Sequence, residues 1–197
     1  MLEEKLNELL EQQHIICIQD VLTMELVVKL RAQILCMAVT SNESPKLFID
    51  CGGGECEAAL IFADFLCSFR IPVVGIINGS CKSSAMLVLQ GCAKRLATPH
   101  SQFFLHHLLH GFNYTLEDAY YKQSKNVNEA HGRETRNQIY EFLAKRTGNT
   151  KKEIREIAKR GECYEWMFYA DTAKKLRFID DIIQPGGYPL LSTPSHT

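Results

Sequence analysis

The chain has 197 residues, of which 46% are hydrophobic and 23% are charged, and its formal net charge is −1. These values are typical of one globular domain with a sizeable core, and they exclude the basic surface of a nucleic-acid-binding protein. No apolar run approaches the roughly 20 residues of a membrane span, and the acidic, amphipathic N-terminus lacks the pattern of a secretory signal.

The first half of the chain alternates short apolar segments with longer segments of helical periodicity. The predicted elements are, in order, an amphipathic helix at 2–10, a strand at 14–18, a helix capped by Thr23, a strand at 46–50, a helix at 55–69 and a strand at 72–77. Asn78 and Gly79 are expected to end this last strand, and Lys94 and Arg95 to end the helix that follows. Alternating strands and helices with short loops predict right-handed βαβ units, hence an α/β fold with a mainly parallel sheet.

The second half of the chain contains fewer apolar segments. The predicted elements are, in order, a strand at 101–107, a long polar helix at 115–146, a helix from Thr150 to Gly161, a helix at 172–176 capped by Asp171, and a strand at 178–183. Capping boxes mark two helix starts, at Thr115 with Asp118 and at Thr150 with Glu153. The long helix is too polar to lie on its own core, so we expect it to project toward a partner chain. Residues 184–197 predict a flexible tail.

The eight cysteines have no C-x-x-C spacing, so neither a zinc knuckle nor a redox motif is indicated. Several of them lie within apolar segments: Cys17, Cys36, Cys67 and Cys92. We expect buried free thiols in a reducing compartment, which predicts a cytoplasmic protein. The net charge and the lack of a long apolar run predict that neither nucleic acid nor a membrane is a partner.

Chemically useful residues gather where two of the predicted strands end. Gly52–Gly54 follow one strand, and Ser83 and Ser84 follow the next. Ligands bind at this edge of open parallel sheets. A strand, a tight turn with a serine and a helix follow the logic of the nucleophile elbow, although the G-x-S-x-G spelling is absent. His106 on a following strand would lie beside Ser83, which favours acyl-transfer chemistry with a nucleophile, a base and backbone donors.

The chain resembles the proteolytic subunit of the Clp protease in four successive segments: LFIDCGGGE, INGSCKSSAM, ATPHSQFFLHH and RTGNTKKEI. The family's I-N-S-P-G-G stands here as residues 49–54, and its G-x-A-[AS]-S-M as residues 79–84. The interval between these motifs matches the family without a gap. The resemblance therefore implies Ser83, rather than Ser84, as the nucleophile and His106 as the catalytic histidine.

The resemblance covers about residues 2–183 and implies a crotonase-like spiral of βαβ units, with the helix at about 115–146 as a projecting handle. One Clp-protease-like catalytic domain, 1–183, would be followed by the tail at 184–197.

The implied activity is that of a serine endopeptidase that hydrolyses unfolded polypeptides without a cofactor or metal. It would act inside a homo-oligomeric barrel of two stacked heptameric rings, a tetradecamer. By the same resemblance, the N–H groups of Gly54 and Ser84 would form the oxyanion hole. An extended substrate would bind beside Gly53 and Glu55.

The acidic member of the implied triad stays open. The family has an aspartate near the end of the helix that follows the T-G motif. Counting forward from Thr147-Gly148 reaches Gly161, whereas counting back from 178–180 reaches Glu165, and neither is an aspartate. Glu165, or alternatively Glu162, would orient the histidine, because any carboxylate can hold its tautomer.

Other interpretations stay open beside the active protease. The chain begins at the first helix, without the family's axial N-terminal loop, so an ATP-dependent unfoldase ring is an open expectation as a partner. The alternative functions are a catalytically inactive structural subunit of a Clp-type barrel and a crotonase-type enzyme acting on an acyl thioester. At single residues the alternatives are a Ser–Lys dyad through Lys82, reactive thiols at Cys51 and Cys81, and a metal bound by His106, His107 and His110.

Overall fold

The computed structural model describes residues 2–106, 121–160 and 165–187 of the chain. The chain divides into two compact units, one made of Met1–Phe104 with Met167–Thr197 and the other of Leu105–Trp166. Among the described residues, no helix is both long and apolar enough to cross a membrane.

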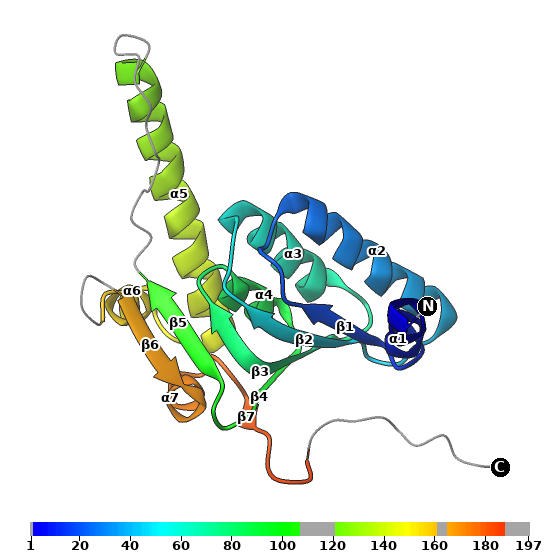
Figure 1. The fold of residues 1–197 in the computed structure, drawn as a ribbon. Coiled ribbons are helices and arrows are strands. Elements are labelled where there is room, and N and C mark those ends of the chain that lie inside the picture. The colour runs from blue at the N-terminus through cyan, green and yellow to red at the C-terminus, as the bar shows by residue number, and fades with distance from the viewer. Residues whose placement is uncertain (1, 107–120, 161–164, 188–197) are drawn as a thin grey trace, which may run out of the picture. The chain divides into compact units, whose positions relative to one another are not determined.

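A seven-stranded sheet organises the fold (Figure 1). Its strands are β1 (Ile15–Ile18), β2 (Lys46–Cys51), β3 (Val74–Lys82), β4 (Lys94–Ala97), β5 (Gln102–His106), β6 (Glu165–Tyr169) and β7 (Asp181–Ile182). Five strands run in the order β1-β2-β3-β4-β7, and each neighbouring pair in this row is parallel. β5 pairs in parallel with the second half of β3, and β6 pairs with β5. The predicted α/β fold with a mainly parallel sheet is therefore confirmed.

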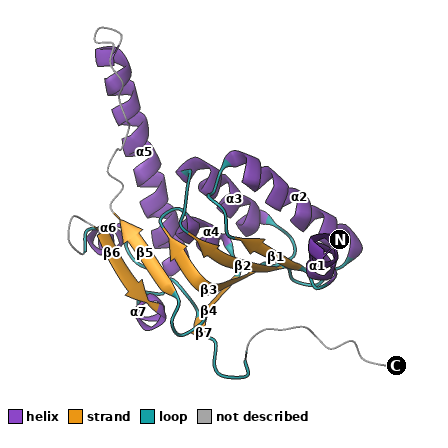
Figure 2. Ribbon diagram, viewed as in Figure 1, coloured by secondary structure: helices purple, strands orange, loops and turns teal. Residues whose placement is uncertain are grey.

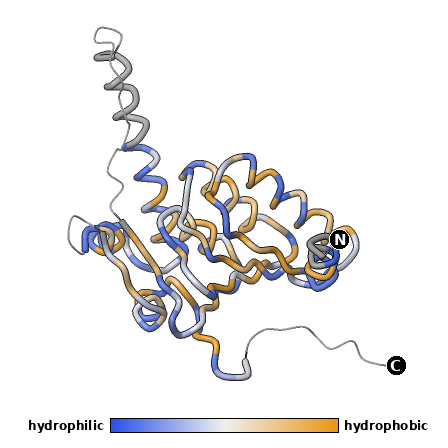
Figure 3. The backbone as a smooth tube through the Cα atoms, viewed as in Figure 1, coloured by the Kyte–Doolittle hydropathy of each residue, from blue (hydrophilic) through white to orange (hydrophobic). Residues whose placement is uncertain are grey.

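Helices of the first unit cover the sheet. They are α1 (Leu2–Gln12), α2 (Met24–Thr40), α3 (Cys56–Ser68), α4 (Ala85–Gly91) and α7 (Ala170–Lys175). α2, α3 and α4 lie side by side along one face of β1–β3 (Figure 2). Strand residues on that face, such as Ile16, Ile49 and Ile77, are buried, and the central strands are mostly hydrophobic in Figure 3. The predicted cap of α2 is confirmed, because Thr23 accepts a hydrogen bond from the Leu26 N–H.

The second unit contains two helices that pack together. They are α5 (Tyr121–Thr147) and α6 (Lys151–Ala158). Among the residues of the two helices whose side chains are described, the buried apolar ones are Ile139, Tyr140, Leu143, Ile154, Ile157 and Ala158. The capping box at the start of α6 is confirmed, because the Thr150 side chain accepts from the Glu153 N–H and the Glu153 carboxylate accepts from the Thr150 N–H. The predicted helix start at Thr115 with Asp118 lies outside the described residues, and so does Gly161.

Strand β3 continues through Asn78 and Gly79, where the sequence predicts its end, as far as Lys82. Asp50 on β2 accepts hydrogen bonds from both the N–H and the hydroxyl of Ser80, at 2.7 and 2.9 Å. A Cβ at position 79 would lie 2.4 Å from the Asp50 carboxyl carbon, so a larger residue there would displace this carboxylate. Beyond this point β3 pairs with β5 instead of β4. The strand is long because its second half has a partner that the local sequence does not reveal.

The helix that the sequence extends to Lys94 and Arg95 ends earlier, and both residues belong to strand β4. Arg95 is 8% exposed, and its guanidinium contacts the Asp180 carboxylate and the Gln90 side chain. Its N–H also donates to the Asp180 carboxylate at 2.7 Å. Asp180 lies 85 residues further along the chain. A distant partner therefore stabilises Arg95 in a strand, where the local pattern of basic residues indicates a helix terminus.

The C-terminal segment differs from the prediction in three ways. β6 was absent from the predicted elements. α7 is capped by Tyr169, so Asp171 lies in the first helical turn and is not the cap. The last strand, β7, has two residues only. Phe178, which the sequence placed in that strand, packs instead against Phe168, with ring centroids 6.0 Å apart. Core packing thus replaces sheet pairing at this position.

The cysteines are more exposed than expected. Those on the surface are Cys17, Cys36 and Cys67, so the prediction of buried thiols is wrong for them. Cys92 is buried as predicted. Cys51 and Cys81 are buried too, and they are partners on β2 and β3 beyond a shift in the strand register.

The ion pair of Arg95 with Asp180 gives a test of the β4 assignment. Asp180→Asn is expected to lower the free energy of unfolding by about 2 kcal/mol, since it leaves a buried guanidinium without its anion but alters a carboxylate that is partly exposed. Urea unfolding followed by circular dichroism measures the change. The matched control is Asp181, whose carboxylate is exposed and pairs with Lys174 at the surface, so Asp181→Asn should shift the urea midpoint by much less. Equal shifts for both variants would contradict the buried role of Asp180.

Candidate active site

Ser83 occupies the turn between β3 and α4 in a left-handed backbone conformation, with φ of 52°. Its N–H donates to the Phe104 carbonyl on β5 at 2.9 Å, and its own carbonyl accepts from the Met86 N–H at 3.1 Å. For a residue other than glycine this conformation costs about 1–2 kcal/mol, so the surrounding structure must hold it. Backbone strain of this kind is typical of the serine in a nucleophile elbow.

The glycine loop after β2 lies directly against this turn. A Cβ at Gly53, where φ is 102°, would be 2.9 Å from both the Lys82 carbonyl oxygen and Ser83 Cβ. A Cβ at Gly54, where φ is 156°, would be 2.2 Å from the Leu22 carbonyl oxygen. The absence of side chains therefore lets the loop fit between Ser83 and Leu22. The two segments that the sequence places at one sheet edge lie together.

Main-chain hydrogen bonds hold the loop on the side away from Ser83. The Leu22 N–H donates to the Gly53 carbonyl at 3.0 Å, and the Glu55 N–H donates to the Leu22 carbonyl at 2.8 Å, which makes a parallel bridge between Leu22 and Gly54. In such a bridge the N–H and C=O of the middle residue point away from the partner strand. The Gly54 N–H therefore points toward the β3 side, where Ser83 lies. Within the described chain it has no hydrogen-bond partner.

Ser84 supplies a second unpaired amide beside the same turn. Its N–H makes no hydrogen bond within the described chain, and it lies 3.2 Å from the position of a Gly53 Cβ. The Ser84 hydroxyl is also buried and, among the described residues, without a partner. Two amides, those of Gly54 and Ser84, thus border the turn of Ser83, as an oxyanion-binding site requires.

The predicted substrate residues Gly53 and Glu55 both make hydrogen bonds within the chain. The Gly53 N–H donates to the Cys51 sulfur, and its carbonyl accepts from Leu22. The Glu55 carboxylate accepts from the Met24 N–H at 3.2 Å. These bonds fix the loop, and substrate binding by Gly53 and Glu55 stays a prediction. Sequence reasoning missed the contribution of Leu22, because an apolar residue before a helix cap gives no chemical signal.

His106 and Glu165 belong to the second unit, whereas Ser83 and the glycine loop belong to the first. His106 is the last residue of β5, and Glu165 is the first residue of β6. The two strands pair and run in opposite directions (Figure 1), so His106 and Glu165 lie at the same end of the pair. The apposition of Ser83 with His106 stays a prediction. Three other candidates lie outside the described residues: Glu162, His107 and His110.

Other candidate nucleophiles and ligands near the turn are less suitable. Burial raises the pKa of the Cys51 thiol and raises that of Cys81 well above its ordinary value. Both thiols are therefore protonated at neutral pH, whereas a nucleophilic cysteine acts as the thiolate. Among the described residues, no three His, Cys, Asp or Glu side chains gather as a metal-binding group. Lys82 is the last residue of β3 and pairs with Phe104.

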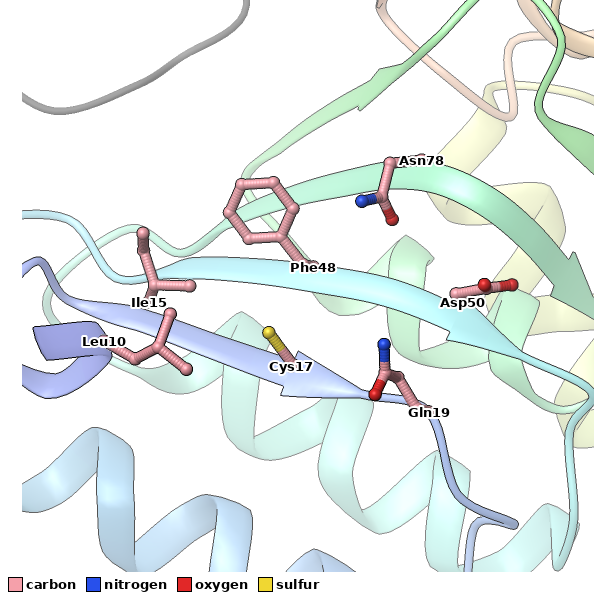
Figure 4. A pocket seen from close by; sticks show the side chains of 7 residues that line it. All are labelled: Leu10, Ile15, Cys17, Gln19, Phe48, Asp50 and Asn78. Carbon is pink, nitrogen blue, oxygen red and sulfur yellow. The ribbon is translucent and has the colours of Figure 1, made fainter. Parts of the chain in front are cut away.

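A pocket of about 200 Å³ opens on the face of the sheet opposite α2, α3 and α4 (Figure 4). Its lining comes from the end of α1 and from β1, β2, β3 and the turn after β1: Leu10, Ile15, Cys17, Gln19, Phe48, Asp50 and Asn78. The apolar side chains gather at one end and the carboxylate and amide side chains at the other (Figure 4). Because these residues come from separate segments, sequence reasoning did not predict the pocket.

The close approach of the loop to Leu22 gives a test of the site geometry. Gly54→Ala is expected to lower the free energy of unfolding by about 3 kcal/mol, because the new Cβ meets backbone atoms that cannot move aside. Gly52→Ala is the matched control, since a Cβ there meets nothing within 4 Å. We expect it to change stability by less than about 0.5 kcal/mol. Urea unfolding measures both, and similar values for the two variants would refute the arrangement.

Comparison with known proteins agrees with this fold. The sequence profile of the Clp protease family matches residues 2–186. The ATP-dependent Clp protease proteolytic subunit 1 of Shouchella clausii is 27% identical over 172 residues, which are 86% of this chain and 84% of that protein. The subunit of the same name from Streptomyces coelicolor is 26% identical over 166 residues, 81% of this chain and 71% of that protein.

A solved structure of a ClpP1 point mutant from Listeria monocytogenes has the same fold, with a TM-score of 0.77. The two chains are 19% identical, and the match covers 93% of this chain and 96% of that one. The chain belongs to the Clp protease family.

Proposed function

We propose that the chain is the catalytic subunit of a Clp-type serine endopeptidase that hydrolyses peptide bonds of unfolded polypeptides. The observation on which this rests is the left-handed φ of 52° at Ser83, the residue that the sequence motifs imply as the nucleophile. A strained serine between a strand and a helix, bordered by two unpaired amides, suits acyl transfer. Membership of the Clp protease family supports the same reaction class.

In the proposed reaction Ser83 Oγ attacks the peptide carbonyl carbon, and the His106 imidazole takes the hydroxyl proton. The N–H groups of Gly54 and Ser84 stabilise the negative oxygen of the tetrahedral intermediate. The carbon–nitrogen bond then breaks, and His106 returns the proton to the leaving amine. In the second half of the reaction His106 takes a proton from water, and the water oxygen attacks the acyl carbon. The ester bond then breaks, and His106 returns the proton to Ser83 Oγ.

We propose Glu165, ahead of Glu162, as the carboxylate that orients His106. Its support is the pairing of β5 with β6, in which His106 and Glu165 stand at the same end. A glutamate is one methylene longer than the family's aspartate, and it can equally hold the imidazole tautomer and stabilise imidazolium.

We further propose that the active form is a homo-oligomer of stacked heptameric rings in the cytoplasm. The two curated relatives are named as proteolytic subunits of an ATP-dependent protease, which supports an ATP-dependent unfoldase ring as the partner that supplies substrate. The polypeptide would add as a strand beside residues 52–57. Both polar backbone groups of Gly53 are already bonded within the chain. The backbone groups that pair with the substrate strand would therefore come from the residues next to Gly53.

Labelling of the assembled protein with a fluorophosphonate probe tests the proposal. Wild-type protein is expected to react, and Ser83→Ala to lose the reaction, because only an activated serine is phosphonylated at a useful rate. Hydrolysis of an unfolded casein substrate should fall by at least about a thousandfold in the same variant. Ser68→Ala, at an exposed serine on α3, is the matched control and should keep both properties.

Two outcomes would contradict the proposal. Labelling that persists in Ser83→Ala would place the reactive group elsewhere. If the wild-type oligomer, with its rings visible by electron microscopy, were not labelled at all, the chain would be the structural subunit of a Clp-type barrel. The observation that favours this second function is the lack of an aspartate at both positions to which the family's spacing points, which hold Gly161 and Glu165.

A further inference from the structure

Cys51 ends β2 directly before the glycine loop, and its side chain is 1% exposed. Its sulfur lies 3.1 Å from the Asp20 carbonyl oxygen, to which it donates. It also accepts a hydrogen bond from the Gly53 N–H at 3.3 Å. One thiol therefore connects the end of β2, the glycine loop and the segment that leads to Leu22.

The thiol must be protonated to make both bonds, because the S–H donates to Asp20 while the sulfur lone pair accepts from Gly53. Burial raises the pKa of Cys51 and outweighs the hydrogen bond from the Gly53 N–H, which lowers it, and the carboxylates of Asp20 and Asp50 raise it further. At neutral pH the side chain is thus a neutral hydrogen-bonding group.

These bonds determine which amide of the loop is left unpaired. The Gly53 N–H is turned toward the Cys51 sulfur, and the Leu22 bridge turns the Gly54 N–H to the opposite side, toward β3. We infer that Cys51 is a positioning residue, whose thiol holds the glycine loop so that the Gly54 N–H faces the Ser83 turn. The role in catalysis rests on the proposed function, whereas the loop contact exists without it.

Cys81 offers a matched control for the effect of packing alone. It is the partner of Cys51 on the adjacent strand, beyond a shift in the strand register, and it is fully buried. Within the described chain its sulfur makes no hydrogen bond. Removing either sulfur leaves a similar small cavity, but only removal at Cys51 breaks a bond to the loop.

The experiment compares the full chain with Cys51→Ala, Cys51→Ser and Cys81→Ala. Native-state hydrogen exchange measures the protection of the Gly53 N–H. The rate of fluorophosphonate labelling measures the function of the proposed oxyanion site. In Cys51→Ala we expect exchange at Gly53 to be about fivefold faster, since its acceptor is gone. Labelling should be about tenfold slower, because a misplaced amide stabilises the developing charge less well. The hydroxyl of Cys51→Ser should restore both rates to within about threefold, and Cys81→Ala should leave exchange at Gly53 unchanged.

Three results would decide against the inference. Exchange at Gly53 that is unchanged in Cys51→Ala would show that the thiol does not hold the loop. Faster exchange at Gly53 with labelling at the wild-type rate would show that the contact has no effect on the site. Equal slowing in Cys51→Ala and Cys81→Ala would assign the effect to packing. Unlabelled wild-type protein would refute the proposed function and the catalytic role together, while exchange at Gly53 would still decide the loop contact.

Discussion

Strand β3 changes partners along its length, with β4 beside its first half and β5 beside its second. The change takes place at Gly79, where the Asp50 carboxylate occupies the space of a side chain and binds Ser80. The rest of the site depends on this contact. It lets the strand continue to Lys82, and it brings Ser83 N–H within hydrogen-bond distance of β5. A strand that stopped at Asn78, as the local sequence suggests, could not hold Ser83 in its left-handed conformation.

The turn costs stability, and the surrounding core offsets that cost. Ser83 has an unfavourable φ, and the Ser84 hydroxyl is buried without a partner among the described residues. Next to them, every residue of α4 is buried, and Gly91 packs so closely on α3 that a Cβ would lie 2.7 Å from Ala63 Cα. The well-packed helix and the bonds to β5 fix the turn, so its strain is a local property of a stable scaffold.

The sequence predicts best the features that depend on neighbouring residues. Thr23 and the pair Thr150 with Glu153 cap helices as expected, and the first strands and helices follow their periodicity. Features that need distant partners were missed. Arg95 is in a strand because Asp180 neutralises it, and the bridge from Leu22 to Gly54 has no signature in either segment. At the candidate site the motifs indicate Ser83 and the glycine loop, but only the three-dimensional structure shows how closely the two approach.

We propose that Ser83 is the nucleophile, and that the N–H groups of Gly54 and Ser84 bind the oxyanion of the tetrahedral intermediate. A crystal structure of the assembled protein after reaction with a peptidyl phosphonate tests it most directly. We expect phosphorus bonded to Ser83 Oγ, with the phosphoryl oxygen about 2.7–3.1 Å from both amide nitrogens. We also expect the His106 imidazole beside the Oγ. An adduct on another side chain, or a phosphoryl oxygen turned away from the glycine loop, would contradict this proposal.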